Sequence, residues 1–344
     1  MASPLNTSPP LAITMGEPGG IGGELTIKAW RALSSGDAAF FVIDDATRLE
    51  AMGAPVERIS SPAEAAKHFA RRLPVLDLGP KFAVKTGVAD KASAPHVIAS
   101  IERAVALALA GEAAGVVTNP IQKASLIAAG FNFPGHTEFL GALTEQTPMP
   151  GGRHRGPIMM LAGPELRTVP VTVHEPLARA AAGLTSDAIV HAGLVTAEAL
   201  QHDFDVARPR LAIAGLNPHA GEGGALGKED GAIIAPAVEA LCKAGVDAGG
   251  GLRPPTPCST KKRARPMTRR SACITICGAH PDQDDQLHDA VNVTLGLPIA
   301  RTSPDHAGTA LDIAGKNIAR ADSLIAAIKL AAEMAGLSAP LQNE

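Results

Sequence analysis

A short apolar run, a glycine-rich turn and a helical pattern follow one another repeatedly along this chain. This repeat constrains the fold more than any other feature. Its clearest copy has an apolar run at residues 211–214, a turn at 215–224 and helical apolar spacing at 228–244. An apolar run of this length predicts a buried strand. Because open α/β sheets place ligands in the turns after such strands, the pattern predicts an α/β fold with a candidate site in this turn.

The turn at residues 215–224 carries groups that suit a binding site. His219 can bind a metal, Glu222 can accept protons, and four glycines let the backbone approach a ligand closely. The alternative interpretation is an ordinary glycine-rich surface loop.

An earlier copy of the repeat has an apolar run at residues 11–15, a turn at 16–24 and a helical pattern that continues to Leu33. The next predicted strand, residues 40–44, ends in an aspartate. This order resembles a dinucleotide-binding turn. Glu17 and Pro18 interrupt the turn, however, and the glycine spacing fits poorly, so the match to that motif is weak.

A third copy leads to a histidine and a hydroxyl. An amphipathic helix at residues 97–110 precedes a predicted buried strand at 115–118, and a turn and a short helix follow. His136 and Thr137 then offer an imidazole and a hydroxyl together, which suits a phosphate or a carboxylate. In the alternative interpretation, Thr137 caps a helix and His136 is a chance neighbour.

Two histidines follow predicted strands in the middle of the chain. Strands are expected at residues 158–162 and 166–173, and His174 comes directly after the second of them. His219 follows the strand at 211–214, after a helix predicted at 186–201. If both strands end at one edge of a sheet, the two imidazoles can share a metal ion that also accepts oxygen ligands.

The last part of the chain is predicted to contain a strand, a turn and a helix. Residues 292–298 are strand-like, residues 301–306 form a polar turn, and residues 324–334 close the chain as a helix. Arg301 in the turn is well suited to bidentate binding of phosphate or carboxylate.

The composition limits the class of protein. A length of 344 residues allows roughly two domains. With one Trp, eight Phe and no Tyr, the core must be filled by Ala, Leu, Ile and Val. A net charge of −3 argues against general nucleic-acid binding, and four cysteines do not suggest a disulfide framework. We expect a cytoplasmic protein with no signal peptide, membrane span or nucleic-acid partner.

The composition changes abruptly after residue 250. Residues 251–280 carry seven Lys or Arg and no acid, and residues 282–289 then carry four Asp. Cys258, Cys273 and Cys277 also lie here, near His280. A zinc site and a basic nucleic-acid patch are both conceivable, but the cysteine spacing matches no standard finger.

Taken together, several of these motifs resemble the 4-hydroxythreonine-4-phosphate dehydrogenase family. They are Gly-Glu-Pro-Gly-Gly-Ile-Gly from residue 16, Gly-His-Thr-Glu-Phe from 135, Gly-Leu-Asn-Pro-His-Ala-Gly-Glu-Gly-Gly from 215, Asn-Val-Thr-Leu-Gly-Leu-Pro from 292 and Arg-Thr-Ser-Pro-Asp-His from 301. The resemblance covers residues 11–250 and 288 to the end.

The resemblance implies a two-domain α/β fold similar to isocitrate and isopropylmalate dehydrogenases, with the active site in the interdomain cleft of a homodimer. Residues 1–10 would form a flexible tail. Residues 11–140 and 300–344 would form the first domain. Residues 141–299 would form the second, with the metal-binding histidines and the dimer contacts.

The resemblance also implies an activity: oxidation of 4-phosphohydroxy-L-threonine by NAD or NADP in pyridoxal 5'-phosphate biosynthesis. The 2-amino-3-oxo acid then decarboxylates to 3-amino-2-oxopropyl phosphate. The family holds a divalent ion, such as zinc, magnesium or cobalt, with three histidines, two of which match His174 and His219. A metal of this kind stabilises the developing alkoxide. Substrate contacts match His136, Thr137, Asn292 and Arg301. The catalytic residue and the cofactor-binding residues stay unassigned.

Two other functions remain open. A sister group oxidises four-carbon sugar-acid 4-phosphates, erythronate or threonate, with the same kind of metal site. A non-catalytic or catalytically impaired homologue is the second alternative, because this chain departs from the family pattern. Counting back from Asn292 puts Thr275 where the family has its third histidine, Gln283 at a substrate lysine and Thr256 at an aspartate.

We hypothesise that residues 252–287 are encoded out of frame. The family-like peptide Met-Phe-His-Glu-Glu-Ala-Arg can be written ATG TTC CAC GAA GAA GCG CGC, and a frame one base later gives Cys-Ser-Thr-Lys-Lys-Arg. That peptide is residues 258–263 here. Met-Tyr-His-Asp similarly yields Cys-Ile-Thr-Ile, which is residues 273–276. The basic run and the clustered cysteines then need no function.

Overall fold

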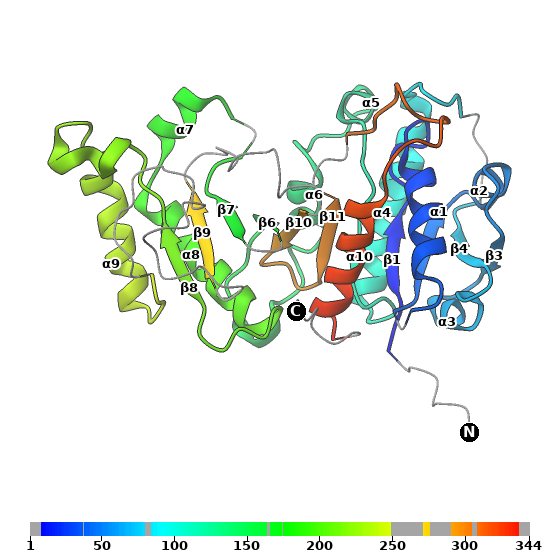
Figure 1. The fold of residues 1–344 in the computed structure, drawn as a ribbon, viewed down its shortest axis with the longest axis horizontal. Coiled ribbons are helices and arrows are strands. Elements are labelled where there is room, and N and C mark those ends of the chain that lie inside the picture. Colours follow the sequence, from blue (N-terminus) through cyan, green and yellow to red (C-terminus); the bar gives the residue numbers. More distant parts are fainter. Residues whose placement is uncertain are drawn as a thin grey trace. The chain divides into compact units, whose positions relative to one another are not determined.

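The computed structural model describes residues 8–36, 38–79, 84–163, 166–173, 175–248, 271–275, 290–304 and 308–336. The chain divides into two compact units, one from residues 1–147 and 298–344 and the other from residues 148–297. Each unit is an α/β body that contains both helices and strands (Figure 1).

Parallel strands form the sheet of the first unit. Their order is β3-β4-β2-β1-β5-β11, and every neighbouring pair is parallel. The strands are β1 (Leu11–Thr14), β2 (Phe40–Asp44), β3 (Val56–Ile59), β4 (Leu73–Asp77), β5 (Val116–Val117) and β11 (Arg301–Pro304). Such a sheet needs cover on both faces, which explains why its central strands β1 and β2 are mostly apolar and buried along their whole length.

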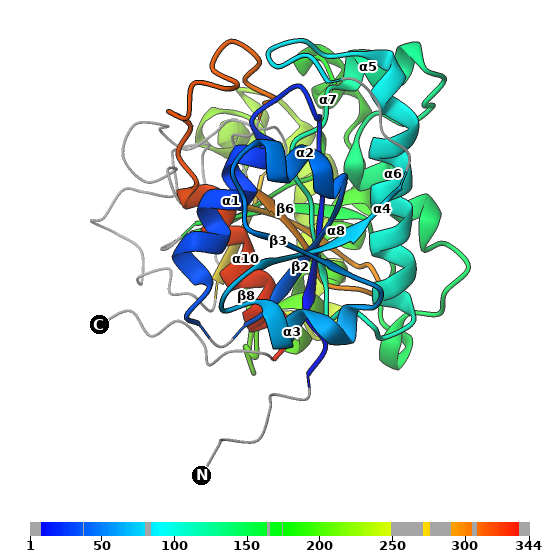
Figure 2. The same cartoon turned by 90° about the vertical axis from the view of Figure 1, so that its right-hand side faces the viewer.

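Helices cover both faces of this sheet. In Figure 2, α1 (Gly22–Leu33) and α10 (Asp322–Met334) lie on one side of the strands, and α4 (Ala94–Leu109) and α6 (His136–Leu143) lie on the other. Shorter helices are α2 (Ala46–Ala51), α3 (Ala65–His68) and α5 (Lys123–Ala128). The hydroxyl of Ser100 fixes α4 to the sheet, because it donates to the carbonyl of Ile43 at 2.7 Å and accepts from the amide of Met15 at 3.0 Å.

The core of the first unit is mostly aliphatic, as the composition predicts. Strands β1 and β2 are completely buried, and the largest buried side chains are mainly Leu and Ile. The few aromatic residues are used at fixed contacts. Phe40 packs edge-on against Phe69 with ring centroids 4.7 Å apart, and the indole of Trp30 donates to the carbonyl of Phe69 at 2.8 Å.

The second unit has a mixed sheet in the order β10-β6-β7-β9-β8. Its strands are β6 (Ile158–Ala162), β7 (Arg167–Pro170), β8 (Arg210–Ile213), β9 (Ser271–Thr275) and β10 (Val291–Leu295). The pairs β10–β6 and β6–β7 are antiparallel, whereas β9 is parallel to both β7 and β8. Its helices are α7 (Leu177–Gly183), α8 (Ser186–His202) and α9 (Ala235–Lys243).

Three local predictions from the sequence were wrong in detail. Residues 301–304 form the buried strand β11 rather than a polar turn, because its backbone pairs with β5 and the Thr302 hydroxyl donates to the carbonyl of Ala327 in α10. The strand expected at residues 166–173 is shorter than predicted, because β7 ends at Pro170. The helix expected at 228–244 begins with a wide π-type turn at Asp230–Ile234 before α9.

No single helix in the described part of the chain is long and apolar enough to cross a membrane. The pair α7 and α8, bent by 94° at the break between them, passes such a test together on length and composition. α8 has the buried face of an ordinary core helix, and a helix of that kind passes the same test.

Candidate functional site

The first unit gathers polar groups at the edge where its parallel strands end. The chain leaves β1 to form β2 on one side, and β5 joins β1 on the other side, so the connections change direction between β1 and β5. Ligands of open α/β sheets bind at such a switch point, outside the carboxyl ends of the strands. Thr118 and Asn119 follow β5 at this edge, and Ser303 and Pro304 end β11 beside them.

Asn119 connects three elements at this edge through its side chain. Its side-chain amide donates to the carbonyl of Thr14 at 2.9 Å and to the hydroxyl of Thr26 at 2.8 Å, which links β5 to β1 and α1. The amide of Glu17 adds a bond to the carbonyl of Pro120 at 2.7 Å. Asn119 is buried, and its Oδ1 has no hydrogen-bond partner among the described residues. An acceptor held in this way is available to a ligand.

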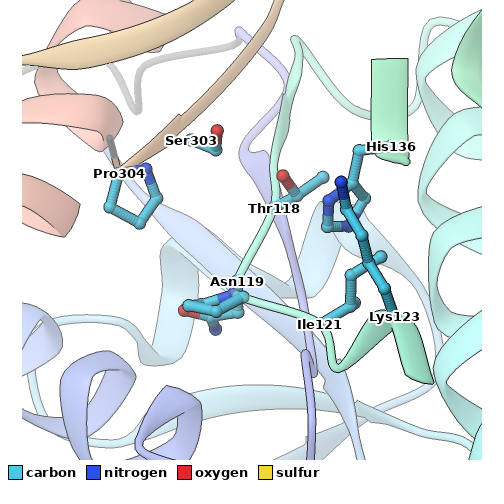
Figure 3. Close-up of a pocket in the computed structure, with 8 residues that line it drawn as sticks. Thr118, Asn119, Ile121, Lys123, His136, Ser303 and Pro304 are labelled. Carbon is cyan, nitrogen blue, oxygen red and sulfur yellow. The ribbon is translucent and has the colours of Figure 1, made fainter. Parts of the chain in front are cut away.

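A pocket opens beside this edge. It is lined by Thr118, Asn119, Pro120, Ile121, Lys123, His136, Ser303 and Pro304 (Figure 3). In Figure 3, Lys123 and His136 lie side by side on one wall, and Ser303 and Pro304 form the opposite wall. The pocket therefore combines two hydroxyls, an imidazole and an ammonium group.

Arg301 lies buried behind the pocket. It is 2 % exposed, and its Nη2 donates to the Thr118 hydroxyl at 2.6 Å. Burial lowers the pKa of the Arg301 guanidinium to about 10, and the carboxylate of Glu138 partly offsets this effect. At neutral pH the side chain therefore stays charged. Its positive charge sits in a low-dielectric setting, where it acts on neighbouring groups more strongly than a surface charge would.

His136 begins α6, after Gly135 in an extended conformation. Burial is the main cause that lowers the pKa of His136 well below its ordinary range, and the cations of Arg301 and Lys123 add to it. The imidazole is neutral at pH 7 as a result. Its Nε2 is buried and has no hydrogen-bond partner in the described structure. A neutral imidazole offers one donor and one acceptor, so it can orient a hydroxyl or an anionic oxygen.

The next two residues of α6 have different positions. Thr137 is half-buried at the first turn of the helix, beside His136. Glu138 is also half-buried, and its Oε2 is buried without a hydrogen-bond partner among the residues that are described. The acid is close enough to Arg301 to raise the pKa of that guanidinium. The structure thus brings His136, Thr137 and Arg301 together in one unit.

The glycines of the turn at residues 16–24 lie in close contacts within the protein. A Cβ on Gly19 would lie 2.1 Å from the carbonyl oxygen of Val88, and one on Gly20 would lie 2.7 Å from that of Thr309. Asp44, the aspartate that ends the strand after this turn, forms a buried ion pair with Arg48 at 2.5 Å. The glycines are needed for contacts within the protein, and the weak resemblance to a nucleotide motif has this structural explanation.

The second unit also aligns three parallel strand ends. β9 lies between β7 and β8, so the carboxyl ends of all three strands share one edge. Thr275 is the last residue of the middle strand, paired in register with Pro170 of β7. His174 follows β7 in sequence but lies outside the described residues. So do Thr256, Gln283, Cys258, Cys277, His280 and the basic run at 261–270.

The turn that carries His219 is well anchored and conformationally unusual. Asp230, which is buried, accepts from the backbone amides of Leu216 and Asn217 at 2.9 and 3.1 Å. His219, Ala220 and Glu222 all have positive φ angles of 41–52°. Each such conformation costs a non-glycine residue about 1 kcal/mol or more and persists only where the surroundings impose it. Strain of this kind favours a functional role for the turn over an ordinary surface loop.

The predicted metal ligands are not assembled within the described residues. No group of three or more His, Cys, Asp and Glu side chains that could hold a metal occurs in that part of the chain. His219 is exposed. Asn292 lies on β10 of the same unit, where its Nδ2 donates to the sulfur of Met159 at 3.3 Å and its Oδ1 is buried without a described partner.

Four residues of these sites were not found from the sequence. Thr118, Asn119 and Lys123 are ordinary residues in a Thr-Asn-Pro-Ile-Gln-Lys stretch, and only their place after a predicted buried strand points to a site. Asp230 sits just beyond the glycine-rich turn. The adjacent acids Glu229 and Asp230 near the start of a predicted helix were the available signal for it.

The fold and the pocket define the class: a two-unit α/β protein with a candidate ligand site at the carboxyl edge of a parallel sheet. Residues 31–331 match the family model described as pyridoxal phosphate biosynthetic protein PdxA. The chain is 51 % identical over 336 residues to a 4-hydroxythreonine-4-phosphate dehydrogenase of Caulobacter vibrioides, which covers 96 % of this chain and 98 % of the relative.

Other similar proteins carry the same name. A 4-hydroxythreonine-4-phosphate dehydrogenase of Bradyrhizobium diazoefficiens is 45 % identical, with 95 % of this chain and 97 % of the relative covered. The crystal structure of the enzyme of that name from Klebsiella pneumoniae is similar with a TM-score of 0.79 at 32 % identity, covering 95 % and 98 % of the two chains. The chain belongs to the PdxA family, which confirms the resemblance inferred from its motifs and the α/β fold that this resemblance implies.

Proposed function

We propose that this protein is a dehydrogenase that oxidises 4-phosphohydroxy-L-threonine with NAD or NADP, as a step of pyridoxal 5'-phosphate biosynthesis. The oxidation removes a hydride from the C3 carbon of the secondary alcohol and a proton from its hydroxyl. The 2-amino-3-oxo acid that results loses carbon dioxide to give 3-amino-2-oxopropyl phosphate.

The observation that carries the proposal is the polar pocket of the first unit, in a chain of this family. A phosphorylated amino acid is a small, strongly anionic ligand. The pocket meets it with the ammonium of Lys123, the hydroxyls of Thr118 and Ser303, and the buried guanidinium of Arg301 behind them. Positive groups next to hydroxyl donors are the arrangement that phosphate and carboxylate oxygens require.

His136, Thr137, Asn292 and Arg301 are proposed to bind the substrate. Neutral His136 can accept a hydrogen bond from the substrate hydroxyl without repelling it, and Arg301 supplies positive charge at a fixed place. His136, Thr137 and Arg301 lie in the first unit, and His219 and Asn292 lie in the second. We propose that the site uses both units in a homodimer, in the cleft that is typical of related two-domain dehydrogenases.

The residues of the second unit do not fit a three-histidine metal site. His174 and His219 are the two ligands that the sequence offers, and Thr275 ends the strand where the third is expected. A threonine hydroxyl is a neutral oxygen and a poor replacement for imidazole as a ligand of zinc or cobalt. We therefore assign no step to a metal ion, and we expect this chain to turn over slowly as written.

Four-carbon sugar-acid 4-phosphates are the second candidate substrates. Erythronate and threonate 4-phosphates carry the same phosphate and carboxylate, and they replace the amino group of hydroxythreonine with a hydroxyl. The groups that line the pocket bind the shared anions and do not distinguish these substrates.

A substrate panel tests the proposal. The chain with codons 252–287 restored to frame is assayed for NADH or NADPH formation with the three 4-phosphates in turn, each with zinc, magnesium or cobalt. We expect the largest kcat/KM with 4-phosphohydroxy-L-threonine. A larger value with a sugar-acid phosphate would transfer the assignment to the sister group, and no turnover with any of them would reject the dehydrogenase.

A further inference from the structure

Lys123 occupies a position in the pocket that neither the motifs nor the family resemblance assigns. It is the first residue of α5 and lines the pocket on the same wall as His136 (Figure 3). Its side chain is exposed, whereas Arg301 is 2 % exposed. Of the two cations at this edge of the described structure, Lys123 is the one that an incoming ligand reaches directly.

The surroundings hold the ammonium group near the pocket. A Cβ on Gly135 would lie 3.5 Å from Lys123 Nζ and 3.4 Å from Glu138 Oε2. The missing side chain at Gly135 therefore leaves room for Lys123 to lie over the start of α6, next to His136.

Lys123 also acts on its neighbour in a way that a solvated surface lysine does not. No hydrogen bond or ion pair to Lys123 is formed by the described residues, yet its charge contributes to the lowered pKa of His136. Lys123 and His136 line the same wall of the pocket, so the ammonium charge acts where a ligand would bind.

We propose that Lys123 is a substrate-binding residue, whose ammonium group contacts an anionic oxygen group held in the pocket lined by Thr118, His136 and Ser303. The ligand chemistry is a phosphate or a carboxylate, the two anionic ends of the substrate. This inference rests on the proposed function for the identity of the substrate, but the anion contact can be measured without turnover.

The experiment measures the binding of inorganic phosphate and of acetate by calorimetry to the full chain and to three variants. K123M removes the charge and keeps the length of the side chain, and K123R keeps the charge. K329M is the matched control, because Lys329 is an exposed lysine on α10 that does not line the pocket. Thermal unfolding of each variant checks that it is folded.

We expect K123M to bind the preferred anion roughly tenfold or more weakly, as the loss of a hydrogen bond to a charged group predicts. K123R should bind within about threefold of the unaltered chain, and K329M should be unchanged. Weakening with phosphate alone assigns Lys123 to the phosphate end, and weakening with acetate alone assigns it to the carboxylate end. Unchanged binding in K123M, equal weakening in K329M, or no saturable binding of either anion by the unaltered chain would overturn the proposal.

A second measurement reports the contact itself. Titration of the His136 ring protons by NMR should show a higher pKa in K123M than in the unaltered chain or in K329M, because one neighbouring cation is removed. An unchanged His136 titration in K123M would also overturn the proposal. Turnover that persists in K123M with unweakened anion binding rejects this inference alone. Anion binding that depends on Lys123, with no turnover by the protein whose codons 252–287 are in frame, rejects only the proposed function.

Discussion

In both units the polar groups follow the ends of parallel strands, but the two sets of groups differ. In each unit, parallel strands end at one edge, and the residues after those ends carry the chemistry. In the first unit the groups are connected, because Asn119 links three elements and Arg301 is hydrogen-bonded to Thr118. In the second unit the middle strand ends in Thr275, where the family resemblance calls for a metal ligand.

The difference shows that a strand tolerates changes that a site does not. β9 pairs with both of its neighbours although its residues are Ser-Ala-Cys-Ile-Thr, and Ile274 is fully buried between them. Backbone hydrogen bonds and one buried β-branched residue suffice for that role. A metal site needs particular atoms at particular places, so on the family pattern the same replacement would remove a ligand.

The largest expected effect comes from restoring the reading frame. With codons 252–287 in frame, the histidine, the lysine and the aspartate of the family pattern return together. Removing a ligand or a supporting group commonly costs 10- to 100-fold, so we expect turnover to rise by roughly 100-fold or more. The measurement is the initial rate of NADH formation at equal protein concentration.

Resequencing of the gene is the control for this prediction. Paired base changes flanking the segment would show that the chain as printed is not the natural product. Equal rates for the two proteins would mean that the segment is functional as it stands.

A smaller effect is expected from the single substitution Thr275→His. An imidazole at the end of β9 adds a third nitrogen ligand between the strands that lead to His174 and His219. Zinc should bind roughly 10- to 100-fold more tightly than to the unaltered chain. Competition with a chromophoric chelator measures this, and T275N serves as the control. Zinc affinity that T275H leaves unchanged would place the third ligand elsewhere.

Two threonines test the proposed anion site of the first unit. Thr118 directly follows β5, and Thr302 lies in the neighbouring strand β11. Thr118→Val removes the hydroxyl that accepts from Arg301, whereas Thr302→Val removes a hydroxyl that only donates to the carbonyl of Ala327. Both should cost about 1 kcal/mol of stability. T118V alone should weaken phosphate binding, by about tenfold, because the guanidinium loses its positioning partner. T118S should restore the binding. Equal weakening by T302V would mean that the effect is structural.

The smallest expected effect is the contribution of His136 to the pH dependence of the free energy of unfolding. Its folded-state pKa is lowered, first by burial and then by Arg301 and Lys123, so the folded chain resists protonation of the ring. The unfolded histidine binds a proton near pH 6.5, so the free energy of unfolding should be constant above that pH and fall below it. Urea unfolding from pH 7.5 to about pH 5 should show a smaller fall for His136→Gln. An unchanged slope in H136Q would contradict the assignment.

Much of the architecture follows from the sequence because apolar runs are a local signal. The predicted strands at residues 11–15, 40–44 and 158–162, and the helices at 97–110 and 186–201, correspond to β1, β2, β6, α4 and α8. The motifs also predict His136, Thr137 and Arg301 as site residues, and the structure places Arg301 near the start of α6, where His136 and Thr137 lie. Their chemistry is visible in the residue types themselves.

The parts that were missed depend on contacts distant in sequence. β11 looks polar because Arg301, Thr302 and Ser303 are all hydrophilic, yet each is buried through pairing with β5 or contact with α10. Lys123 and Thr118 acquire their role only when β5 and β11 lie side by side. No residue-by-residue pattern encodes that juxtaposition.

The most direct test of the contrast between the units is a paired binding measurement on two proteins, the chain as written and the chain with codons 252–287 in frame. Phosphate and zinc affinities are determined for both by calorimetry. We predict equal phosphate affinities, because the first unit is the same in both proteins. We predict that zinc binds roughly 10- to 100-fold more tightly to the in-frame protein. Equal zinc affinities, with the chain as written binding zinc as tightly as the in-frame protein, would contradict it.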